Sequence, residues 1–593
     1  MRHLLRKLTM VKGLQEIASV CSGAFANDAK NGGYREAVKA LNLLQTNASV
    51  LNEVREKRKK GYIERDENVQ DTRKFLARSG ISLEDLDALP VIHVAGTKGK
   101  GSTCALCESI LRHYGMEKTK QCSSKKGAFE LSPMPIRTGL YTSPHLIEVR
   151  ERIQLNGRPI SHNLFATYFW KVYNKLMEKR EHEKDMPPYF KFLTVLAFNI
   201  FIKEGVDVAV IEVGIGGEND CTNVIRKPVV IGITTLGIDH QKILGDTLDK
   251  IAWQKAGIMK TGAPAFTALG QAPIALKALE ERAKEKKVTL KVCPPLSSYS
   301  FGHSPLSLAL SSQVQEGNAS LALQLSNVWI KWHEKSSFSG SSSSGEHLCI
   351  ASPFELDAGM INGLIECKWP GRTQILHWQD SGITFFLDGA HTAESIKACL
   401  EWFTKESLQI SPIGHEACIG DGVKNEAQEV TRVLLFNSTG DRNIENLLGP
   451  FAESGLFKHV MFSPNTTKPS MDLTSDQTNM MVSQEAVSAR CQEHRTIWQM
   501  YNKEAQVSLH ACVANALGSI KDLTMPSDLD GGKRKKIHVL VSGSLHLVGS
   551  VLSIIDPDLS CSLSPQELHS QDVLNLSKMH CHGQSSKYVP SPA

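Results

Sequence analysis

Short apolar runs alternate with helical patterns along most of this chain. The first run, Val91–Ala95, has strand character and leads through a glycine-rich turn into a helical pattern that we expect to end at Gly115. Residues 189–202 are apolar on nearly every side, which predicts a helix buried between layers. Other apolar runs predict a strand that ends near Tyr141 and buried strands at residues 208–213, 229–234, 383–387, 433–436 and 537–541.

Weaker patterns and irregular stretches separate these elements. Residues 34–60 predict an amphipathic helix or helix pair, and Asp246 is expected to cap the helix that follows it. Residues 296–358 are rich in serine, leucine and glycine, so we expect a surface insertion of little regular structure. Within this insertion, residues 318–332 have helical periodicity, and Asn318 is the candidate cap.

The alternation of buried strands and helices on both sides of the insertion predicts an α/β protein with two units. Residues 464–536 of the second unit are polar and poorly patterned. The predicted boundaries are a leader or flexible N-terminus at 1–33, a first unit at 34–295, an insertion or linker at 296–366, a second unit at 367–556 and a disordered tail at 557–593.

The turn after the first strand, GTKGKGS at 96–102, carries the most specific chemistry. Its glycines allow positive φ angles and close approach of the backbone, so that several N–H groups and the N-terminus of the following helix converge on an anion. Lys100 adds a mobile positive charge for the outer phosphates, and the hydroxyl of Ser102 or Thr103 lies where a phosphate-bound Mg²⁺ is usually met. The flanking strand and helix favour a phosphate-binding site over a glycine-rich turn without a ligand.

A carboxylate interrupts the valine-rich run at residues 208–213 near its C-terminal end. This residue, Glu212, must be paired, protonated or bound to a metal, because an isolated buried charge is too costly. In an open parallel sheet the strand C-termini meet at one edge, so Ser143, Glu212 and His240 are expected to converge beside the phosphate turn. Taken singly, each side chain also fits a simpler role as a loop hydroxyl, a buried salt bridge or a capping histidine. Together they favour a Mg²⁺ site.

Composition narrows the class of protein. A chain of 593 residues with 41% hydrophobic content is long enough for two or three domains with substantial cores. The net charge of +5 implies no nucleic-acid partner, and no apolar run reaches the ~18 residues of a membrane span. The 14 cysteines are scattered, which suits a reducing compartment, and Cys104 and Cys107 are expected to pack in a core. Residues 1–15 are basic and amphipathic, typical either of a mitochondrial transit peptide or of an ordinary flexible terminus.

A set of short motifs occurs in one collinear order over about residues 34–555. The motifs are GTKGKGS at 96–102, YTSPHL at 141–146, RERI at 150–153, PPYFKFLT at 187–194, EVGIGG at 212–217, GIDH at 237–240, IAWQKAGI at 251–258, WPGRTQ at 369–374, LDGAHT at 387–392, NSTGDR at 437–442 and VSGSLHLVG at 541–549. With these motifs the sequence closely resembles folylpolyglutamate synthase, a family of the Mur ligase superfamily. The ALNLLQTNA segment at 40–48, Lys98 and Thr392 look like the eukaryotic branch of that family.

The resemblance implies both a fold and a reaction. The implied fold is a P-loop-type, mostly parallel-sheet ATPase domain that also binds folate, followed by a smaller Rossmann-like α/β domain. The implied reaction is the ATP-dependent addition of L-glutamate to the γ-carboxylate of tetrahydrofolates and their polyglutamates. The carboxylate would first become an acyl phosphate, and the glutamate amine would then displace phosphate. Mg²⁺ is the implied cofactor, ATP the co-substrate, and a monovalent cation such as K⁺ a further candidate.

The motifs also imply roles for particular residues. The implied catalytic residues are Lys100, His391 and Lys255. Lys255 matches the lysine that is carbamoylated in many Mur-type ligases, and a plain structural lysine is the alternative. The residues implied to bind ATP are Gly96, Thr97, Lys98, Gly99, Lys100, Gly101, Ser102, Asn318, Arg372 and Asp388, and those implied to hold Mg²⁺ are Ser143, Glu212 and His240.

The sequence departs from the family at one place and leaves two other functions open. Residues 117–136 form an insertion where the family has a short connection, either a genuine loop near the folate site or a gene-model artefact. The alternatives are a related dihydrofolate synthase or cell-wall Mur-type ligase, and a non-catalytic nucleotide-binding protein. The intact Lys100, Glu212, His240 and Asp388 argue against the non-catalytic protein. We expect a monomer in the cytoplasm, the mitochondrial matrix or both.

Overall fold

The computed structural model describes most of the chain. The described residues are 32–45, 67–123, 135–300, 313–334, 349–378, 381–409, 430–439, 442–469, 472–478, 484–525 and 535–559. The predicted leader up to residue 31 and the predicted tail from residue 560 lie outside them, as do residues 46–60 of the predicted N-terminal helix pair.

The larger sheet has nine strands in the order β4-β3-β2-β5-β1-β6-β7-β8-β9. From β2 to β9 the neighbouring strands are parallel, whereas β3 and β4 form an antiparallel edge. The strands are β1 Val91–Ala95, β2 Thr138–Tyr141, β3 Ile153–Leu155, β4 Arg158–Pro159, β5 Val208–Glu212, β6 Val230–Ile233, β7 Ala265–Thr267, β8 Leu290–Val292 and β9 Cys349–Ile350. The predicted first strand and the strands predicted at 208–213 and 229–234 are therefore confirmed to within one residue at each end.

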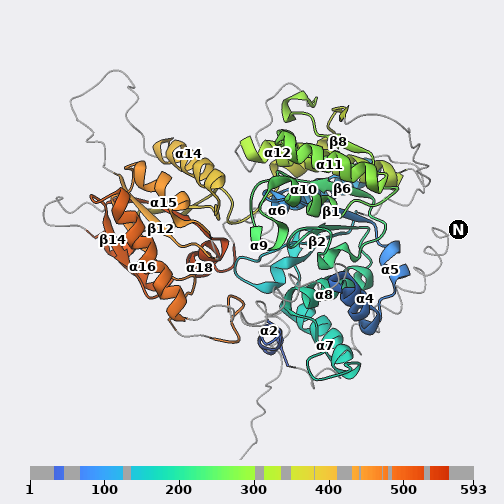
Figure 1. The fold of residues 1–593 in the computed structure, drawn as a ribbon, viewed down its shortest axis with the longest axis horizontal. Coiled ribbons are helices and arrows are strands. Elements are labelled where there is room, and N and C mark those ends of the chain that lie inside the picture. The colour runs from blue at the N-terminus through green and yellow to red at the C-terminus, as the bar shows by residue number, and fades with distance from the viewer. Residues whose placement is uncertain are drawn as a thin grey trace, which may run out of the picture.

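Helices cover both faces of this sheet (Figure 1). One face carries α2, α4, α5, α7 and α8 over β2 and β5, with α10 and α11 over β6 and β7. The opposite face carries α6, α12 and α13. The helical segments of this unit are α2 Tyr34–Asn42, α4 Glu67–Ser79, α5 Leu83–Ala88, α6 Lys100–Ser123, η1 Val149–Arg152, α7 His162–Glu178, α8 Tyr189–Glu204, η2 Cys221–Val224, α9 Gln241–Leu244, α10 Leu248–Ala256, α11 Pro273–Lys286, η3 Leu296–Ser298, α12 Gln313–Glu334 and α13 Ala358–Ile365.

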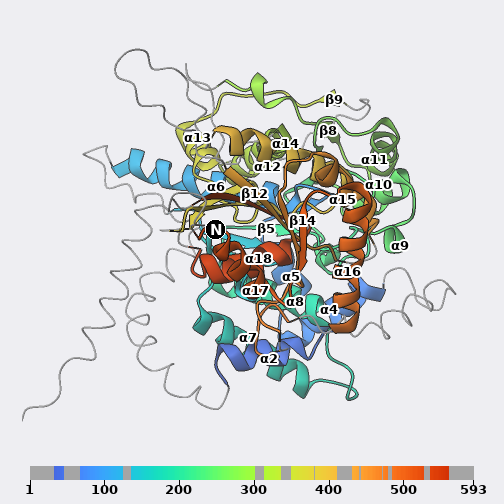
Figure 2. The same ribbon diagram turned by 90° about the vertical axis from the view of Figure 1, so that its left-hand side faces the viewer.

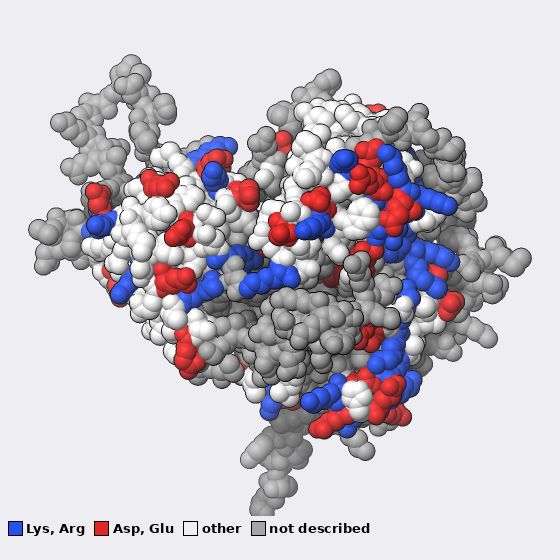
Figure 3. All heavy atoms as spheres, in the orientation of Figure 1, with Lys and Arg blue, Asp and Glu red and all other residues white. Residues whose placement is uncertain are grey.

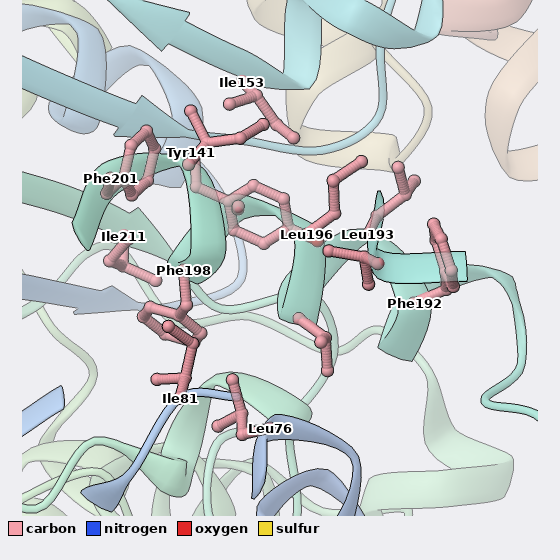
Figure 4. Close-up of a cluster of buried hydrophobic side chains, with 14 of the residues drawn as sticks. Leu76, Ile81, Tyr141, Ile153, Phe192, Leu193, Leu196, Phe198, Phe201 and Ile211 are labelled. Carbon is pink, nitrogen blue, oxygen red and sulfur yellow. The ribbon is translucent and has the colours of Figure 1, made fainter. Parts of the chain in front are cut away.

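The most apolar helix, α8, lies between the sheet and the outer helices, as its pattern predicts. Figure 4 shows Phe198 and Leu196 of α8 within a cluster that also includes Ile211 of β5 and Leu76 of α4. All four side chains are at most 1% exposed. The helix ends at Gly205, whose left-handed φ of 63° turns the chain toward β5.

Helix α6 begins within the glycine-rich turn and is longer than its sequence predicts. The prediction that it ends at Gly115 is wrong, because the helix continues to Ser123 and therefore into the predicted insertion. A Cβ at Gly115 would lie 2.7 Å from the backbone nitrogen of Ile136, so this glycine admits a neighbouring segment and does not end the helix. Cys104 and Cys107 on α6 are buried in the core, as predicted.

Helix α12 corrects the prediction that residues 296–358 are a surface insertion of little regular structure, and it confirms the helix predicted at 318–332. It spans 22 residues and packs on the sheet and on α6. The apolar residues from 319 to 330 fall on several sides of the helix and fill this core, with Trp329 fully buried. Asn318 lies inside the helix and is not its cap. Nearby, Gly363 of α13 lets that helix lie against the α6 backbone at Ile110.

The start of α10 also differs from the prediction. Thr247, not Asp246, precedes the first helical residue, and Asp246 instead accepts a hydrogen bond of 2.8 Å from Lys250. An acidic residue one position before the cap can pair with a lysine in the first turn, so composition alone does not separate the two roles. Gly257 follows the last helical residue, as predicted.

The smaller sheet has six strands in the order β10-β11-β15-β12-β13-β14, all parallel except the β10 and β11 pair. The strands are β10 Gln374–Trp378, β11 Ile383–Leu387, β12 Val430–Phe436, β13 His459–Phe462, β14 Gln506–Leu509 and β15 Lys536–Ser542. The three strands predicted in this unit are β11, β12 and β15, which lie side by side at its centre. They were predictable because their side chains are buried on both faces.

Five helices cover the smaller sheet in the described part of the chain. Figure 2 shows α17 and α18 on one side of it and α15 and α16 on the other. The helices are α14 Ala393–Gln409, α15 Ile444–Glu453, α16 Gln484–Tyr501, α17 Val513–Asp522 and α18 Leu545–Ile555. Residues 464–536, which are polar and poorly patterned in the sequence, contain α16, β14 and α17. These elements bury only one face, so their polar residues hide the pattern.

The two units meet along the loop that follows β2. The backbone oxygen of Leu146 lies so close to α18 that a Cβ at Gly549 would be 1.9 Å away from it, and Leu146 packs in the core of the second unit. Figure 3 shows acidic and basic side chains on both units of the face it views. No helix in the described ranges combines the length and the apolar character needed to cross a bilayer.

Candidate active site between the two sheets

The glycine-rich turn lies at the C-terminal end of β1 and leads into the N-terminus of α6. Gly96 has a φ of 152° and Gly99 a φ of 82°, conformations that L side chains rarely adopt. The backbone N–H groups of Thr97 and Lys98 both donate to the carbonyl oxygen of Thr235, at 3.0 and 3.1 Å. The turn is thus fixed against the end of β6. Because the N–H groups at a helix N-terminus bind anions, the start of α6 is the candidate phosphate site.

Asn318 supports the turn from behind. A Cβ at Gly99 would lie 2.2 Å from the Asn318 Oδ1, which also accepts a hydrogen bond of 3.4 Å from Thr103. The Asn318 amide nitrogen donates to Gln315 at 2.9 Å, and the residue is 2% exposed. The structure therefore brings Asn318 to the phosphate turn as a packing partner of its backbone.

Lys255 of α10 reaches the turn from the opposite side. Its Nζ donates to the carbonyl oxygen of Gly96 at 2.7 Å, and the residue is only 3% exposed. Burial, reinforced by the positive charge of Lys100, lowers the pKa of Lys255 to about 7. Lys255 therefore loses its proton more readily than an exposed lysine does.

Glu212 is the last residue of β5 and lies beside Ser143 and Lys100. Because β2, β5 and β1 are parallel neighbours, with Val94 opposite Glu212, their C-terminal ends meet here. The Ser143 backbone N–H donates to Glu212 Oε2 at 2.8 Å, and the Lys100 Nζ lies 3.9 Å from Oε1. Burial raises the pKa of Glu212, against the opposing effect of Lys100. The predicted meeting of Ser143 with Glu212 is therefore present.

His240 is brought to the same edge but not into contact with these two groups. It is exposed, has a φ of 52° and precedes the short helix α9. Across the described ranges, no hydrogen bond or ion pair joins His240 to Ser143 or Glu212. The same ranges hold no cluster of three or more His, Cys, Asp or Glu side chains suited to a metal ion. Of the three residues predicted to hold Mg²⁺, Ser143 and Glu212 therefore contact each other, whereas His240 contacts neither of them in the described ranges.

Lys98 of the glycine-rich turn contacts His391 of the second unit. The Lys98 Nζ lies 3.1 Å from His391 Nε2 and 3.3 Å from Asp239 Oδ2. His391 Nδ1 lies 2.8 Å from the carbonyl oxygen of Gly389, to which only an N–H can donate, so Nε2 is free to accept from Lys98. Burial and then Lys98 lower the pKa of His391 well below its usual value, which keeps the ring neutral. Burial lowers the pKa of Lys98 to about 8, although Asp239 opposes the shift.

Asp388 and Arg372 lie on neighbouring turns of the second unit. Asp388 accepts hydrogen bonds of 2.9 Å from the backbone N–H groups of Thr373 and Ala390. Burial raises the pKa of Asp388, and the positive charge of Arg372 opposes that rise. The carboxylate thus shapes the turn after β11, from which His391 extends toward Lys98.

Sequence reasoning missed Asp220, which holds the glycine turn after Glu212. Its Oδ2 accepts from the Ile215 backbone N–H at 3.0 Å, and its Oδ1 accepts from the N–H and the hydroxyl of Thr222 at 2.9 and 2.7 Å. The Thr222 hydroxyl in turn meets His93 Nε2 of β1 at 3.0 Å. A buried aspartate that follows a run of glycines is the signal that could have found it.

Comparison with known proteins finds relatives of one family. No protein-family model matches the chain. It is 41% identical over 583 residues to "Folylpolyglutamate synthase, mitochondrial" of Homo sapiens, an alignment that covers 89% of this chain and 92% of the relative. It is 35% identical to folylpolyglutamate synthase of Neurospora crassa, covering 94% of this chain and 99% of the relative.

A solved structure has the same fold. The Mycobacterium tuberculosis folylpolyglutamate synthase complexed with ADP is 20% identical, with a TM-score of 0.58 over 83% of this chain and 94% of the solved chain. The two-sheet architecture, with a P-loop-type unit followed by a smaller α/β unit, is therefore the one expected from the sequence. By its identity to the curated relatives over nearly the whole of both sequences, the chain belongs to the folylpolyglutamate synthase family.

Proposed function

We propose that this chain is an ATP-dependent ligase that adds L-glutamate to the γ-carboxylate of tetrahydrofolates and their polyglutamates. Membership of the family supports the reaction. The observation that carries the assignment to this chain is the intact phosphate turn, in which Lys100 lies 3.9 Å from the buried Glu212. A copy that had lost catalysis would have no need to keep a lysine and a desolvated carboxylate together.

In the proposed mechanism the turn and α6 bind the phosphates of ATP. The residues assigned to this task are Gly96, Thr97, Lys98, Gly99, Lys100, Gly101 and Ser102, with Asn318, Arg372 and Asp388 assigned supporting roles. The substrate carboxylate oxygen attacks the γ-phosphorus, and the bond from phosphorus to the β,γ-bridging oxygen breaks, which gives an acyl phosphate and ADP. Lys100 offsets the negative charge that builds on the transferred group.

Mg²⁺ fits the residues at the end of β5. Glu212 supplies a desolvated carboxylate and Ser143 a hydroxyl, and magnesium in such sites takes one or two carboxylates together with phosphate oxygens and water. We assign Ser143, Glu212 and the more exposed His240 to hold it. When bound, it would neutralise phosphate charge and orient the γ-phosphoryl group.

In the second step the glutamate amine attacks the acyl carbon, the C–O bond to phosphate breaks, and the amine loses a proton as the amide forms. We assign His391 a place close to the phosphates. As a neutral ring it accepts a hydrogen bond from Lys98, so it orients that ammonium and adds no charge of its own.

Lys255 has two proposed states. A neutral amine attacks CO₂ readily, and a carbamate formed there would replace a cation with an anion beside the turn. The pKa of about 7 for Lys255 supports this modification. The alternative is an unmodified lysine that only braces the carbonyl of Gly96.

Several finer points stay predictions. The name of the human relative supports a mitochondrial form, and a cytoplasmic form remains a prediction. K⁺ as a second cation, a monomeric state and the unit boundaries at 295, 367 and 556 are likewise proposed. We keep 1–33 as a leader or flexible N-terminus and 557–593 as a tail. Residues 296–366 join the two units in the sequence, and their α12, α13 and β9 pack with the first unit.

The test is incorporation of labelled L-glutamate into tetrahydrofolate by the purified chain with Mg-ATP, and with dihydropteroate in a parallel assay. We expect product from tetrahydrofolate with release of ADP and phosphate. We also expect the rate of ADP release to fall by about a thousandfold in the Lys100→Ala variant, while its melting temperature stays that of the wild type. Product only from dihydropteroate would assign a dihydrofolate synthase instead. Product from neither pterin, with folded protein, would refute the ligase.

A further inference from the structure

A seven-residue segment of the second unit lies against the first unit. We call residues 472–478, between β13 and α16, the clasp. Its Asp476 Oδ1 accepts from the Tyr34 hydroxyl at 2.6 Å and from the Val149 backbone N–H at 2.7 Å. Asn42 of α2 donates to two clasp carbonyl oxygens, those of Leu473 and Ser475, at 2.9 and 3.0 Å. The clasp thus joins α2 and η1 of the first unit to the second unit.

His145 contacts both the clasp and Arg152. Its Nε2 lies 3.0 Å from the backbone oxygen of Asp476, and its Nδ1 lies 2.9 Å from the Nε of Arg152. Because an arginine nitrogen only donates, Nδ1 must accept, and Nε2 then carries the hydrogen that is donated to the clasp. His145 is 6% and Arg152 8% exposed, so each of these hydrogen bonds is shielded from water.

The Arg152 guanidinium uses only part of its donor set. Of the side-chain hydrogen bonds recorded in the described ranges, Arg152 makes only the one from its Nε, while its guanidinium lies over the Tyr189 ring at 5.6 Å. Burial lowers the pKa of His546 in the second unit and the Arg152 charge adds to that shift, while in the first unit the same charge opposes the rise that burial causes in the pKa of Glu212. The terminal nitrogens are thus available to a carboxylate that lies between the units.

We propose that His145 is a positioning residue, which holds Arg152 toward the carboxylates of the bound substrates only while the clasp is seated on α2 and η1. The chain of contacts runs from Tyr34 and Asn42 through the clasp to His145 and then to Arg152. Docking of the second unit therefore completes a substrate contact made by the first. This inference rests on the proposed ligase activity.

Two substitutions at one position separate the two contacts. In His145→Asn the side-chain oxygen falls near the place of Nδ1, so the Arg152 contact is kept and the clasp contact is lost. In His145→Gln the amide nitrogen falls near the place of Nε2, so the clasp contact is kept and the Arg152 contact is lost. We expect each variant to raise the KM for L-glutamate or folate by about tenfold, with the KM for ATP within about twofold.

A matched tyrosine pair tests the clasp away from the site. Tyr34→Phe removes the hydrogen bond to Asp476, and Tyr168→Phe removes an equivalent hydrogen bond of 2.6 Å to Glu204 outside the site. We expect Tyr34→Phe to raise the same KM by about threefold and to speed amide hydrogen exchange in residues 472–478. Tyr168→Phe should change neither.

The possible outcomes separate a failure of this proposal from a failure of the proposed function. Wild-type KM values in both His145 variants, or an equal loss for all three substrates that follows the melting temperature, would overturn the proposal. If the wild-type chain does not ligate glutamate, the proposed function fails by itself. The clasp is then judged by hydrogen exchange alone, which His145→Asn must accelerate in residues 472–478 and His145→Gln must leave unchanged.

Discussion

Lys100 and Glu212 face each other at 3.9 Å, yet neither satisfies the other with a close hydrogen bond. The only hydrogen bond recorded for the Glu212 carboxylate in the described ranges comes from the backbone of Ser143. Both side chains therefore keep hydrogen-bonding capacity for a third, charged or strongly polar partner. Substitution of Lys100 and substitution of Glu212 should affect different steps of the activity.

Replacing Glu212 with glutamine should raise the Mg²⁺ concentration for half-maximal activity by about 10- to 100-fold. The folded protein should not lose stability. Burial raises the pKa of Glu212, so the ionised carboxylate opposes folding at every pH above that pKa, and glutamine removes this penalty at neutral pH. Magnesium titration of activity and thermal unfolding check the two expectations. Glu178→Gln, at an exposed position on α7, is the control. An unchanged magnesium requirement would remove Glu212 from the metal site.

Lys255 should make the free energy of unfolding rise with pH. Its pKa is about 7 in the fold against 10.5 for an ordinary lysine, so between these values the unfolded chain holds a proton that the folded chain has released. Stability therefore rises with pH across that window, by at most about 1.4 kcal/mol per pH unit from this group.

The Lys255→Met variant lacks this contribution. The variant should therefore be most stable relative to wild type below pH 7, and this relative stability should fall as the pH rises toward 10. Urea unfolding at pH 6.5 and pH 9 measures the difference. Parallel pH profiles for the two proteins would contradict the lowered pKa.

Gly99→Ala should weaken ATP binding without unfolding the protein. The new Cβ would lie 2.2 Å from Asn318 Oδ1 at a φ of 82°. Gly262 provides the matched control, because its φ of 89° imposes the same backbone strain of about 1–2 kcal/mol while nothing lies within 4 Å. We expect the KM for ATP to rise by about tenfold in Gly99→Ala and to stay unchanged in Gly262→Ala. Adding Asn318→Ala to Gly99→Ala should recover part of the loss.

Asp220 should matter through the turn that it holds. Asp220→Ala frees the Ile215 backbone N–H and the Thr222 hydroxyl, so we expect kcat to fall by about 100-fold as the Glu212 end of β5 loses its support. Asp220→Asn keeps one acceptor oxygen and should lose less. Steady-state kinetics with circular dichroism spectra separates this effect from unfolding. Equal activity in all three proteins would show that the turn is held by other contacts.

The part of the site that the sequence predicts is the part in which chemistry and local structure coincide. The turn at 96–102 and Glu212 each stand at the end of an apolar strand, and parallel pairing then brings their ends together. Ser143 was found for the same reason. In each case a few consecutive residues hold both the structural and the chemical signal.

What the sequence did not predict depends on partners far away in the chain. Asn318 has the pattern of a helix cap, and only the packing of α12 on α6 turns it into a support for Gly99. Gly115 has the pattern of a helix end, and only the approach of Ile136 explains it. The clasp lies in a polar segment with no apolar signal, because its contacts with Tyr34 and Val149 are hydrogen bonds.

The contact between Leu146 and Gly549 has a consequence for how the enzyme is made in the cell. The loop that carries Ser143 and His145 leaves the ribosome early, whereas α18, the last described helix, leaves it late. Until synthesis has passed Ile555, the Leu146 side chain has no second-unit core to enter and the loop has nothing to rest against. A chain that stops before α18 therefore lacks the helix against which Leu146 rests, and the loop that carries Ser143 and His145 loses this contact with the second unit.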